Sequence, residues 1–170
     1  MTLAEAAAQA DELAQSGAER DLAELRTTWQ DELESAARSA DFRERAVAFR
    51  AIGQFRWRAK EELLRRGLDD TSPAARGSAL LSLELLSRDH PSTVNGVRSL
   101  LHTLITSDDN AAVRRLATLC LKNGSPQRET IVLLEGIGGD DEADAELRRA
   151  ASGVAQQLRR RASTQQQQKR

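Results

Sequence analysis

Few side chains of the chain have the type and spacing that catalysis or metal binding requires. Cys120 is the only cysteine, and His90 and His102 are the only histidines. No other Cys or His lies at ligand spacing from either histidine, so a zinc site is not expected. Cys120 sits between Leu119 and Leu121 in a helical pattern, which favours a buried thiol over a nucleophile. The sequence therefore predicts no catalytic residue, no metal, no cofactor and no enzyme.

Cations are the side chains best placed for binding. The segment FRWRAKEELLRR, residues 55–66, interleaves aromatic and basic residues, a composition that can suit nucleic acid. Helical spacing instead places Phe55 and Trp57 on two different apolar faces, so we expect Trp57 to lie in the core. The C-terminal segment LRRRASTQQQQKR is basic, and such tails contact acidic surfaces without specificity.

Charge is segregated along the chain, although the net charge is −1. Residues 1–40 carry −6, residues 41–68 carry +4, residues 69–146 carry −6 and residues 147–170 carry +7. Local fields of this kind steer partners of opposite charge. No apolar run approaches the roughly 20 residues that span a bilayer, and the acidic N-terminus is unlike a signal peptide. With a single cysteine, the chain is expected to be soluble, cytoplasmic, free of disulfides and not bound to a membrane.

The elements that position these side chains are predicted to be helices. Ala, Leu, Arg, Glu and Gln dominate the composition, and all are good helix formers. Residues 1–40 carry two helical stripes, starting with the capping-box pair Thr2 and Glu5 and interrupted at Gly17. We expect them to cap the core as a hairpin, with a coiled-coil dimer contact as the alternative. Caps and breakers then delimit helices near residues 42–53, 55–66, 73–88, 91–106, 111–123, 126–137 and 144–161.

A five-residue motif recurs four times between residues 41 and 161. Each copy has an apolar residue, then Arg, two variable residues and Ala, with starts 33, 38 and 34 residues apart. The copies are 42–46, 75–79, 113–117 and 147–151. An acidic residue lies six positions before the Arg in the last three copies. A period in this range is typical of helical solenoids, and the polar segment 162–170 that follows is expected to be disordered.

The motif resembles the HEAT repeat, in which a Leu-rich helix runs into an Asp-containing turn and the next helix opens with Val-Arg and then Ala. The segment from Leu100 to Leu121, LLHTLITSDDNAAVRRLATLCL, is most similar to it. The resemblance implies an all-α fold: a short right-handed α-solenoid of about three to four helical pairs, with the helices of residues 1–40 as its cap.

The resemblance also implies roles for two sets of residues. Acidic and basic positions of successive repeats would alternate in a ladder that sets the register: Asp70, Arg76, Asp108, Arg114, Glu142 and Arg148. Second helices of the repeats would line a concave surface, on which one row of side chains would bind a partner: Arg58, Arg65, Arg98, His102 and Arg128. Arg suits bidentate contacts with carboxylates, so an acidic protein segment is the expected partner, unless nearby glutamates neutralise the row.

The function expected from these features is that of a non-catalytic scaffold or adaptor module that binds a protein or peptide on its concave face. The alternative is a nucleic-acid-binding protein that uses a basic concave face and the basic tail. The acidic segment 69–146 argues against that alternative. Some proteins of the family are lyases that attach bilins, but no residue of this sequence marks a bilin site.

Overall fold

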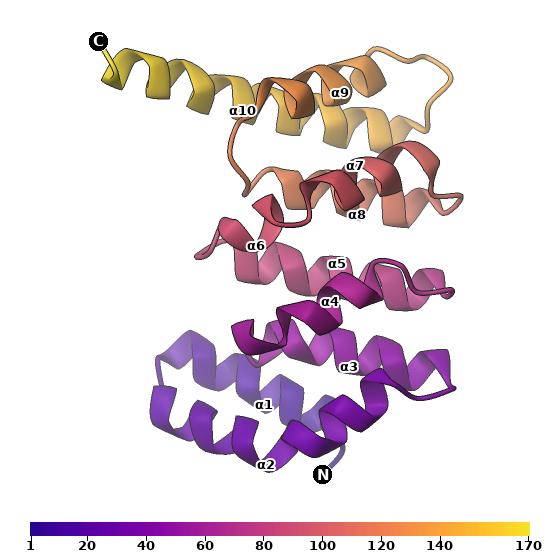
Figure 1. Ribbon diagram of the computed structural model, residues 1–170, viewed down its shortest axis with the longest axis vertical. Helices are drawn as coiled ribbons and strands as arrows, with labels where there is room; N and C mark the ends of the chain where they lie inside the picture. Colours follow the sequence, from indigo (N-terminus) through magenta and orange to yellow (C-terminus); the bar gives the residue numbers. More distant parts are fainter. The chain divides into compact units, whose positions relative to one another are not determined.

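The computed structural model describes residues 1–170, which form helices and the turns between them (Figure 1). Ten α-helices and one short 3-10 helix make the chain 77% helical, and there are no strands. The prediction of an all-α protein is therefore confirmed. The chain forms two compact units, Met1–Leu86 and Ser87–Arg170, and each is described by itself.

The first unit begins with three helices that pack on one another. Its elements are α1 (Leu3–Ser16), α2 (Glu19–Ala37), α3 (Phe42–Gln54), the 3-10 helix η1 (Arg58–Lys60), α4 (Glu61–Gly67) and α5 (Pro73–Ser87), whose last residue belongs to the second unit. Helices α1, α2 and α3 each contact the other two (Figure 1). Ala6, Leu22, Leu33 and Ile52 are buried among them. The helices of residues 1–40 therefore belong to the same compact unit as α3.

Local sequence accounts for both ends of α1. The Thr2 hydroxyl accepts a hydrogen bond from the Glu5 amide at 3.2 Å, and the Glu5 carboxylate accepts one from the Thr2 amide at 2.7 Å. This reciprocal pair satisfies amides that the first helical turn leaves without partners. Gly17 ends the helix with φ of 75°, a conformation that glycine adopts without a Cβ clash. The predicted capping box is confirmed.

Helices α3 and α5 approach closely at Gly53. Its amide donates a hydrogen bond to Ser82 Oγ at 3.0 Å, and the Ser82 hydroxyl donates to the Phe49 carbonyl. A Cβ atom on Gly53 would lie 2.7 Å from Ser82 Cα. The absence of a side chain at Gly53 therefore sets how near the two helices can come.

A turn follows α3 where the sequence predicts a helix over 55–66. Arg56 has φ of 51°, outside the right-handed helical region, and helical structure resumes with η1 and α4. Phe55 and Trp57 flank this residue and are buried, with ring centroids 5.7 Å apart. Arg26 of α2 holds the turn by donating to the carbonyls of Phe55 and Arg56 at 2.8 and 3.1 Å. The core position predicted for Trp57 is confirmed.

The second unit contains the remaining helices. They are α6 (Ser92–Asn95), α7 (Arg98–Ser107), α8 (Ala111–Leu121), α9 (Arg128–Gly138) and α10 (Ala145–Gln168). Helix α7 packs on α8, while α8 and α9 both pack on α10. Cys120 is fully buried, as predicted. The helix predicted over 91–106 is instead broken between α6 and α7 at Gly96. Only proline is less favourable in a helix than glycine.

The C-terminal residues differ from the sequence-based expectation of disorder from residue 162. Helix α10 continues to Gln168 and extends beyond the end of α9 (Figure 1). Its first half packs on α8 and α9, whereas residues 163–170 are exposed. Gln and Arg are good helix formers, and adding a residue to an existing helix costs less than nucleating one. The C-terminal turns of α10 are therefore helical because they extend the packed first half of the helix, and not because their own sequence would start one.

Candidate functional site

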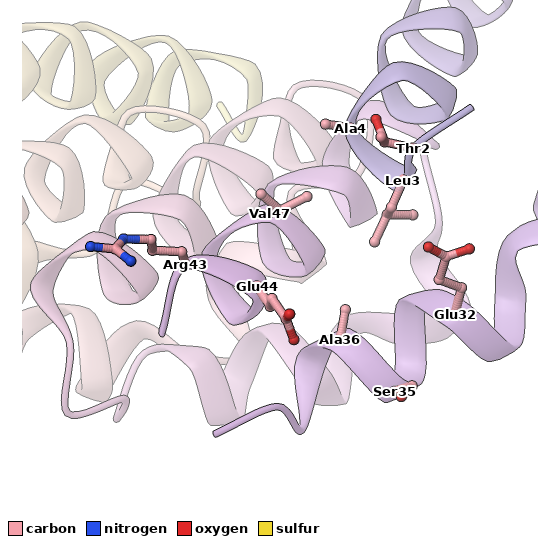
Figure 2. A pocket seen from close by; sticks show the side chains of 9 residues that line it. All are labelled: Thr2, Leu3, Ala4, Glu32, Ser35, Ala36, Arg43, Glu44 and Val47. Carbon is pink, nitrogen blue, oxygen red and sulfur yellow. The ribbon is translucent and has the colours of Figure 1, made fainter. Parts of the chain in front are cut away.

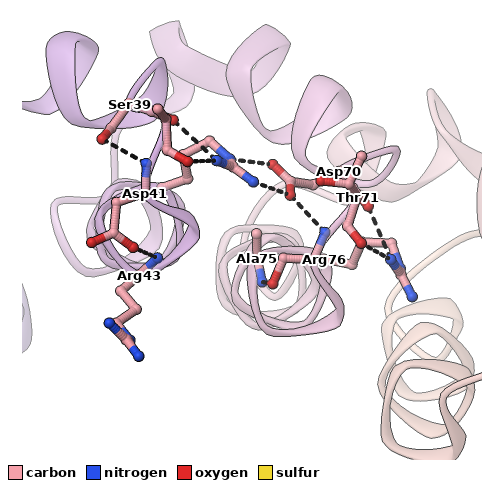
Figure 3. A network of polar contacts seen from close by, with 10 residues as sticks. Ser39, Asp41, Arg43, Asp70, Thr71, Ala75 and Arg76 are labelled. Atoms are coloured by element: carbon pink, nitrogen blue, oxygen red, sulfur yellow. Dashed lines mark hydrogen bonds and ion pairs between the residues drawn. The ribbon is translucent and has the colours of Figure 1, made fainter.

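An ion pair joins α3 to the turn before α5 in the first unit. Arg45 Nε and Nη2 lie 2.8 and 2.9 Å from the two carboxylate oxygens of Asp70. Figure 3 shows Asp70 within this network of polar contacts. The side chains are only 16% and 9% exposed, so the pair is screened less than one at the surface. Hydrogen bonds from Arg45 hold the pKa of Asp70 below its usual range. The Ser72 amide also donates to Asp70, at 2.9 Å.

Arg45 and Arg76 make the same contacts with the backbone. Each Nη1 donates to the carbonyls six and five residues earlier, at 3.0 and 3.1 Å for Arg45 and at 2.9 and 3.4 Å for Arg76 (Figure 3). Arg45, and not Arg43 as the motif suggested, is therefore the counterpart of Arg76 in the first copy. With this shift of two residues, a fully buried alanine follows three positions after the arginine in all four copies: Ala48, Ala79, Ala117 and Ala151.

Two of the predicted ladder residues stabilise helix ends in the second unit. Asp108 accepts a hydrogen bond from the Asn110 amide at 2.9 Å in the turn before α8. Arg114 Nε donates to the carbonyl of Ile105 near the end of α7, at 2.7 Å. A cation near carbonyls at a helix C-terminus is favourable because it opposes the negative end of the dipole. These contacts connect α7 to α8.

In the last copy of the motif, only one of the two predicted ladder residues forms an ion pair. Arg148 Nη1 lies 3.7 Å from Asp141, whereas the predicted acidic position, Glu142, is exposed. Arg115 of α8 lies 3.8 Å from Glu146 of α10, in a half-exposed ion pair. Such a pair contributes about 0–1 kcal/mol. Apolar packing of α8 on α10 is therefore the main contact between these two repeat helices.

A groove of about 590 Å³ opens on the first unit, where the start of α1, the second half of α2 and the start of α3 meet (Figure 2). Leu3, Ala36 and Val47 supply its apolar surface, and Val47 is 39% exposed. Two more exposed apolar side chains, Met1 and Phe42, belong to residues next in sequence to the lining. The full lining is Thr2, Leu3, Ala4, Glu32, Ser35, Ala36, Arg43, Glu44 and Val47.

Carboxylates surround the apolar surface of this N-terminal groove. Glu32 of α2 and Glu44 of α3 line it from two sides, and neither forms an ion pair (Figure 2). Arg43 is the one cation in the lining, and its guanidinium lies 5.3 Å from the ring centroid of Phe42. The lining has no His, Cys or Lys, so its chemistry is that of contact and charge recognition.

The corrected repeat explains why this surface is exposed. The position before the arginine is a buried apolar residue in three copies, namely Ala75, Val113 and Leu147. In the first copy that position is Glu44, which is exposed and lines the groove. Only a departure from the repeat pattern marked this site in the sequence, because the motif as aligned over residues 42–46 placed Phe42, and not Glu44, before the arginine.

The side chains of the predicted partner-binding row differ in exposure. Arg58 and Arg65 are exposed in the first unit, and Arg128 is exposed in the second. Arg58 lies 3.5 Å from Glu61, so part of its charge is neutralised. A role for these three arginines in binding an acidic segment stays a prediction.

The predicted exposure of Arg98 is wrong, since this side chain is only 8% exposed. Its Nη1 donates to Thr130 Oγ1 at 2.9 Å, and its Nη2 donates to Asn95 Oδ1 and Ser125 Oγ at 2.6 and 2.8 Å. Arg98 thus links the break between α6 and α7 to the start of α9. Helical spacing placed Arg98 on the polar side of its helix, away from the apolar face. The start of α9 packs over that polar side and buries Arg98.

His102 is half-buried next to Arg98, and its Nε2 lies 2.9 Å from Thr130 Oγ1. Burial lowers the pKa of His102, and although the nearby Glu129 charge opposes this shift and the Arg98 charge adds to it, the net direction is downward. The folded chain therefore binds this proton less readily than the unfolded chain does. The stability that follows is fully present above about pH 6.5, the ordinary pKa of histidine, and is lost as the pH falls toward the folded pKa.

We expect His102→Gln to reduce the pH dependence of unfolding between about pH 7.5 and pH 5.5, the range in which histidines rather than carboxylates titrate. Gln can keep a hydrogen bond to Thr130 but has no proton to gain. Thermal unfolding followed by circular dichroism should show a larger drop in melting temperature for the parent chain than for the variant. An equal drop in the two proteins would show that protonation of His102 does not cause the pH dependence.

Comparisons with known proteins place the chain in no family. No protein-family model, curated protein or solved structure matches it. None of its helices has the length and apolar character needed to cross a membrane. No three His, Cys, Asp or Glu side chains are grouped so that they could hold a metal ion.

Proposed function

We propose that the chain is a HEAT-like α-solenoid that acts as a non-catalytic protein-interaction module. The four buried alanines of the corrected repeat support this architecture. In the second unit, α8 and α10 both open with the repeated motif and pack on each other, and each also packs on the helix before it. Small side chains at such contacts let repeat helices stack closely, which is how solenoids build a continuous core.

The observation that carries the proposed activity is the N-terminal groove. Its exposed apolar surface would gain about 1.5–3 kcal/mol from covering one large apolar side chain of a partner. Glu32 and Glu44, which have no cationic partner within the chain, would then attract Lys or Arg beside that side chain. The net charge of −6 over residues 1–40 also favours a positively charged partner. The occupant is therefore a protein segment that carries an apolar anchor next to basic residues.

A peptide selection against the full chain tests this proposal. Random peptides displayed on phage should be enriched for a Leu, Met or aromatic residue within a turn of Lys or Arg. Val47→Asp should weaken binding of an enriched peptide by about tenfold or more, the size expected for loss of a central apolar contact. Fluorescence anisotropy with the labelled peptide measures the change.

The matched control is Leu81→Asp, because Leu81 is 40% exposed in the same unit and lies outside the groove. It should leave the affinity within about twofold, as expected for a site outside the contact. Glu44→Lys should weaken the same peptide and reduce the salt dependence of its binding. Selection of acidic peptides, or equal losses from Val47→Asp and Leu81→Asp, would rule out the groove as the binding site.

A further inference from the structure

A pocket of about 440 Å³ in the second unit has four positively charged side chains in its lining. It lies between the residues that follow α5, the C-terminal end of α8 and the middle of α10. Its charged side chains are Arg88, Lys122, Arg160 and Arg161, and two amides, Asn123 and Gln157, complete the polar lining. No acidic side chain lines this basic pocket, so the group that fits it is an anion.

Arg161 is held in place at this pocket. Its Nη2 donates to the carbonyls of Lys122 and Gly124 at 2.8 and 2.6 Å, and its other two nitrogens form no hydrogen bond within the chain. No carboxylate pairs with it, although the side chain is half-buried. The carbonyl contacts hold the guanidinium plane in place, and its Nε and Nη1 remain available to an external acceptor.

Two neighbouring arginines of α10 differ in whether they form an ion pair within the chain. Arg159 forms a bidentate ion pair with Glu135 of α9, in which Nη2 and Oε2 are 2.8 Å apart. Arg160 lines the pocket, is exposed and has no ion pair. Beyond the pocket α10 continues for two turns, with Lys169 and Arg170 at its end and no acidic residue after Glu146. Lys169 lies eight residues after Arg161, about 12 Å along the helix.

We propose that the basic pocket and the exposed end of α10 bind the phosphate backbone of a nucleic acid. A protein partner is less suitable because protein interfaces have an apolar centre, whereas protein–nucleic acid interfaces are polar and basic. None of the chain's exposed large apolar residues lies in α10. This surface is on the second unit and is independent of the N-terminal groove, so either proposal can fail without the other.

The lining of the pocket also indicates which form of nucleic acid it would bind. It contains no aromatic ring, so it offers no platform on which unpaired bases could stack. We therefore expect duplex DNA to bind at least as well as single strands and without preference for sequence. With about three or four phosphates contacted by Arg160, Arg161, Lys169 and Arg170, the logarithm of the affinity should fall with the logarithm of salt with a slope of about −3 to −4.

The test is fluorescence anisotropy of the full chain with a labelled duplex of about 20 base pairs, titrated at several KCl concentrations. Arg160→Gln should weaken binding about fivefold to tenfold near 0.1 M salt and reduce the slope by about one, as expected for one lost phosphate contact. The matched control is Arg159→Gln, which removes the same charge one residue away but from a side chain paired with Glu135. It should change the affinity less than about twofold.

Three results would overturn the proposal. The first is no duplex binding at low salt, and the second is an equal loss from Arg160→Gln and Arg159→Gln, which would show only a dependence on net charge. The third is Arg160-dependent binding of inorganic phosphate or of poly-glutamate without binding of duplex. That result would assign the pocket to small anions or to an acidic protein segment.

Discussion

The substitution Val113→Asp should unfold the second compact unit. Val113 is 1% exposed and occupies the apolar repeat position in the first turn of α8. Burying a carboxylate there without a partner costs several kcal/mol, a large fraction of the about 5–15 kcal/mol that stabilises a domain. The start of a helix favours an acidic side chain by only about 0.3–1 kcal/mol, which offsets little of that cost.

The matched control for this prediction is Val132→Asp, the same substitution at a side chain of α9 that is 55% exposed. It should change the free energy of unfolding by less than about 0.5 kcal/mol, as is usual for surface sites. Far-UV circular dichroism with urea titration compares both variants with the parent chain. Similar midpoints for the two variants would contradict the view that packing at the repeat position holds this unit together.

Most helices of the fold could be predicted because caps and apolar periodicity are local properties of the sequence. Asp41 and Asn110 cap α3 and α8 with their side chains, and Gly17 ends α1. The turn at Arg56 could not be predicted, because the carbonyls it exposes are satisfied by Arg26, a residue of another helix. Helical periodicity cannot show such a contact, which depends on how α2 packs.

The candidate site was less accessible to sequence reasoning for a related reason. A helical wheel separates an apolar face from a polar one, but a helix that packs on several other segments is covered on more than one side. Arg98 lies on the polar face of α7 and is nevertheless buried, since Thr130 and Ser125 accept its hydrogen bonds. The groove beside Glu44 required the true register of the first repeat, which only the contacts of Arg45 reveal.

The substitution Gly53→Ala should destabilise the first unit, although alanine favours a helix over glycine by about 1 kcal/mol. The new Cβ would lie 2.6 Å from Ser82 Oγ and 2.7 Å from Ser82 Cα. A flexible side chain could move away, but the Cα atom belongs to the backbone of α5, so the two helices must separate. Overpacking of this kind costs about 1–3 kcal/mol, and the hydrogen bond from the Gly53 amide to Ser82 would be strained as well.

Gly136→Ala is the matched control, because Gly136 lies inside α9 and a Cβ there would have no atom within 4 Å. It should stabilise its unit by about 0.5–1 kcal/mol through helix propensity alone. The melting temperature should therefore fall by several degrees for Gly53→Ala and rise by a few degrees for Gly136→Ala, since about 1 kcal/mol shifts it by roughly 2–8 °C in domains of this size range. A rise for both variants would show that α3 and α5 do not depend on the missing side chain, and that their separation is set by other contacts.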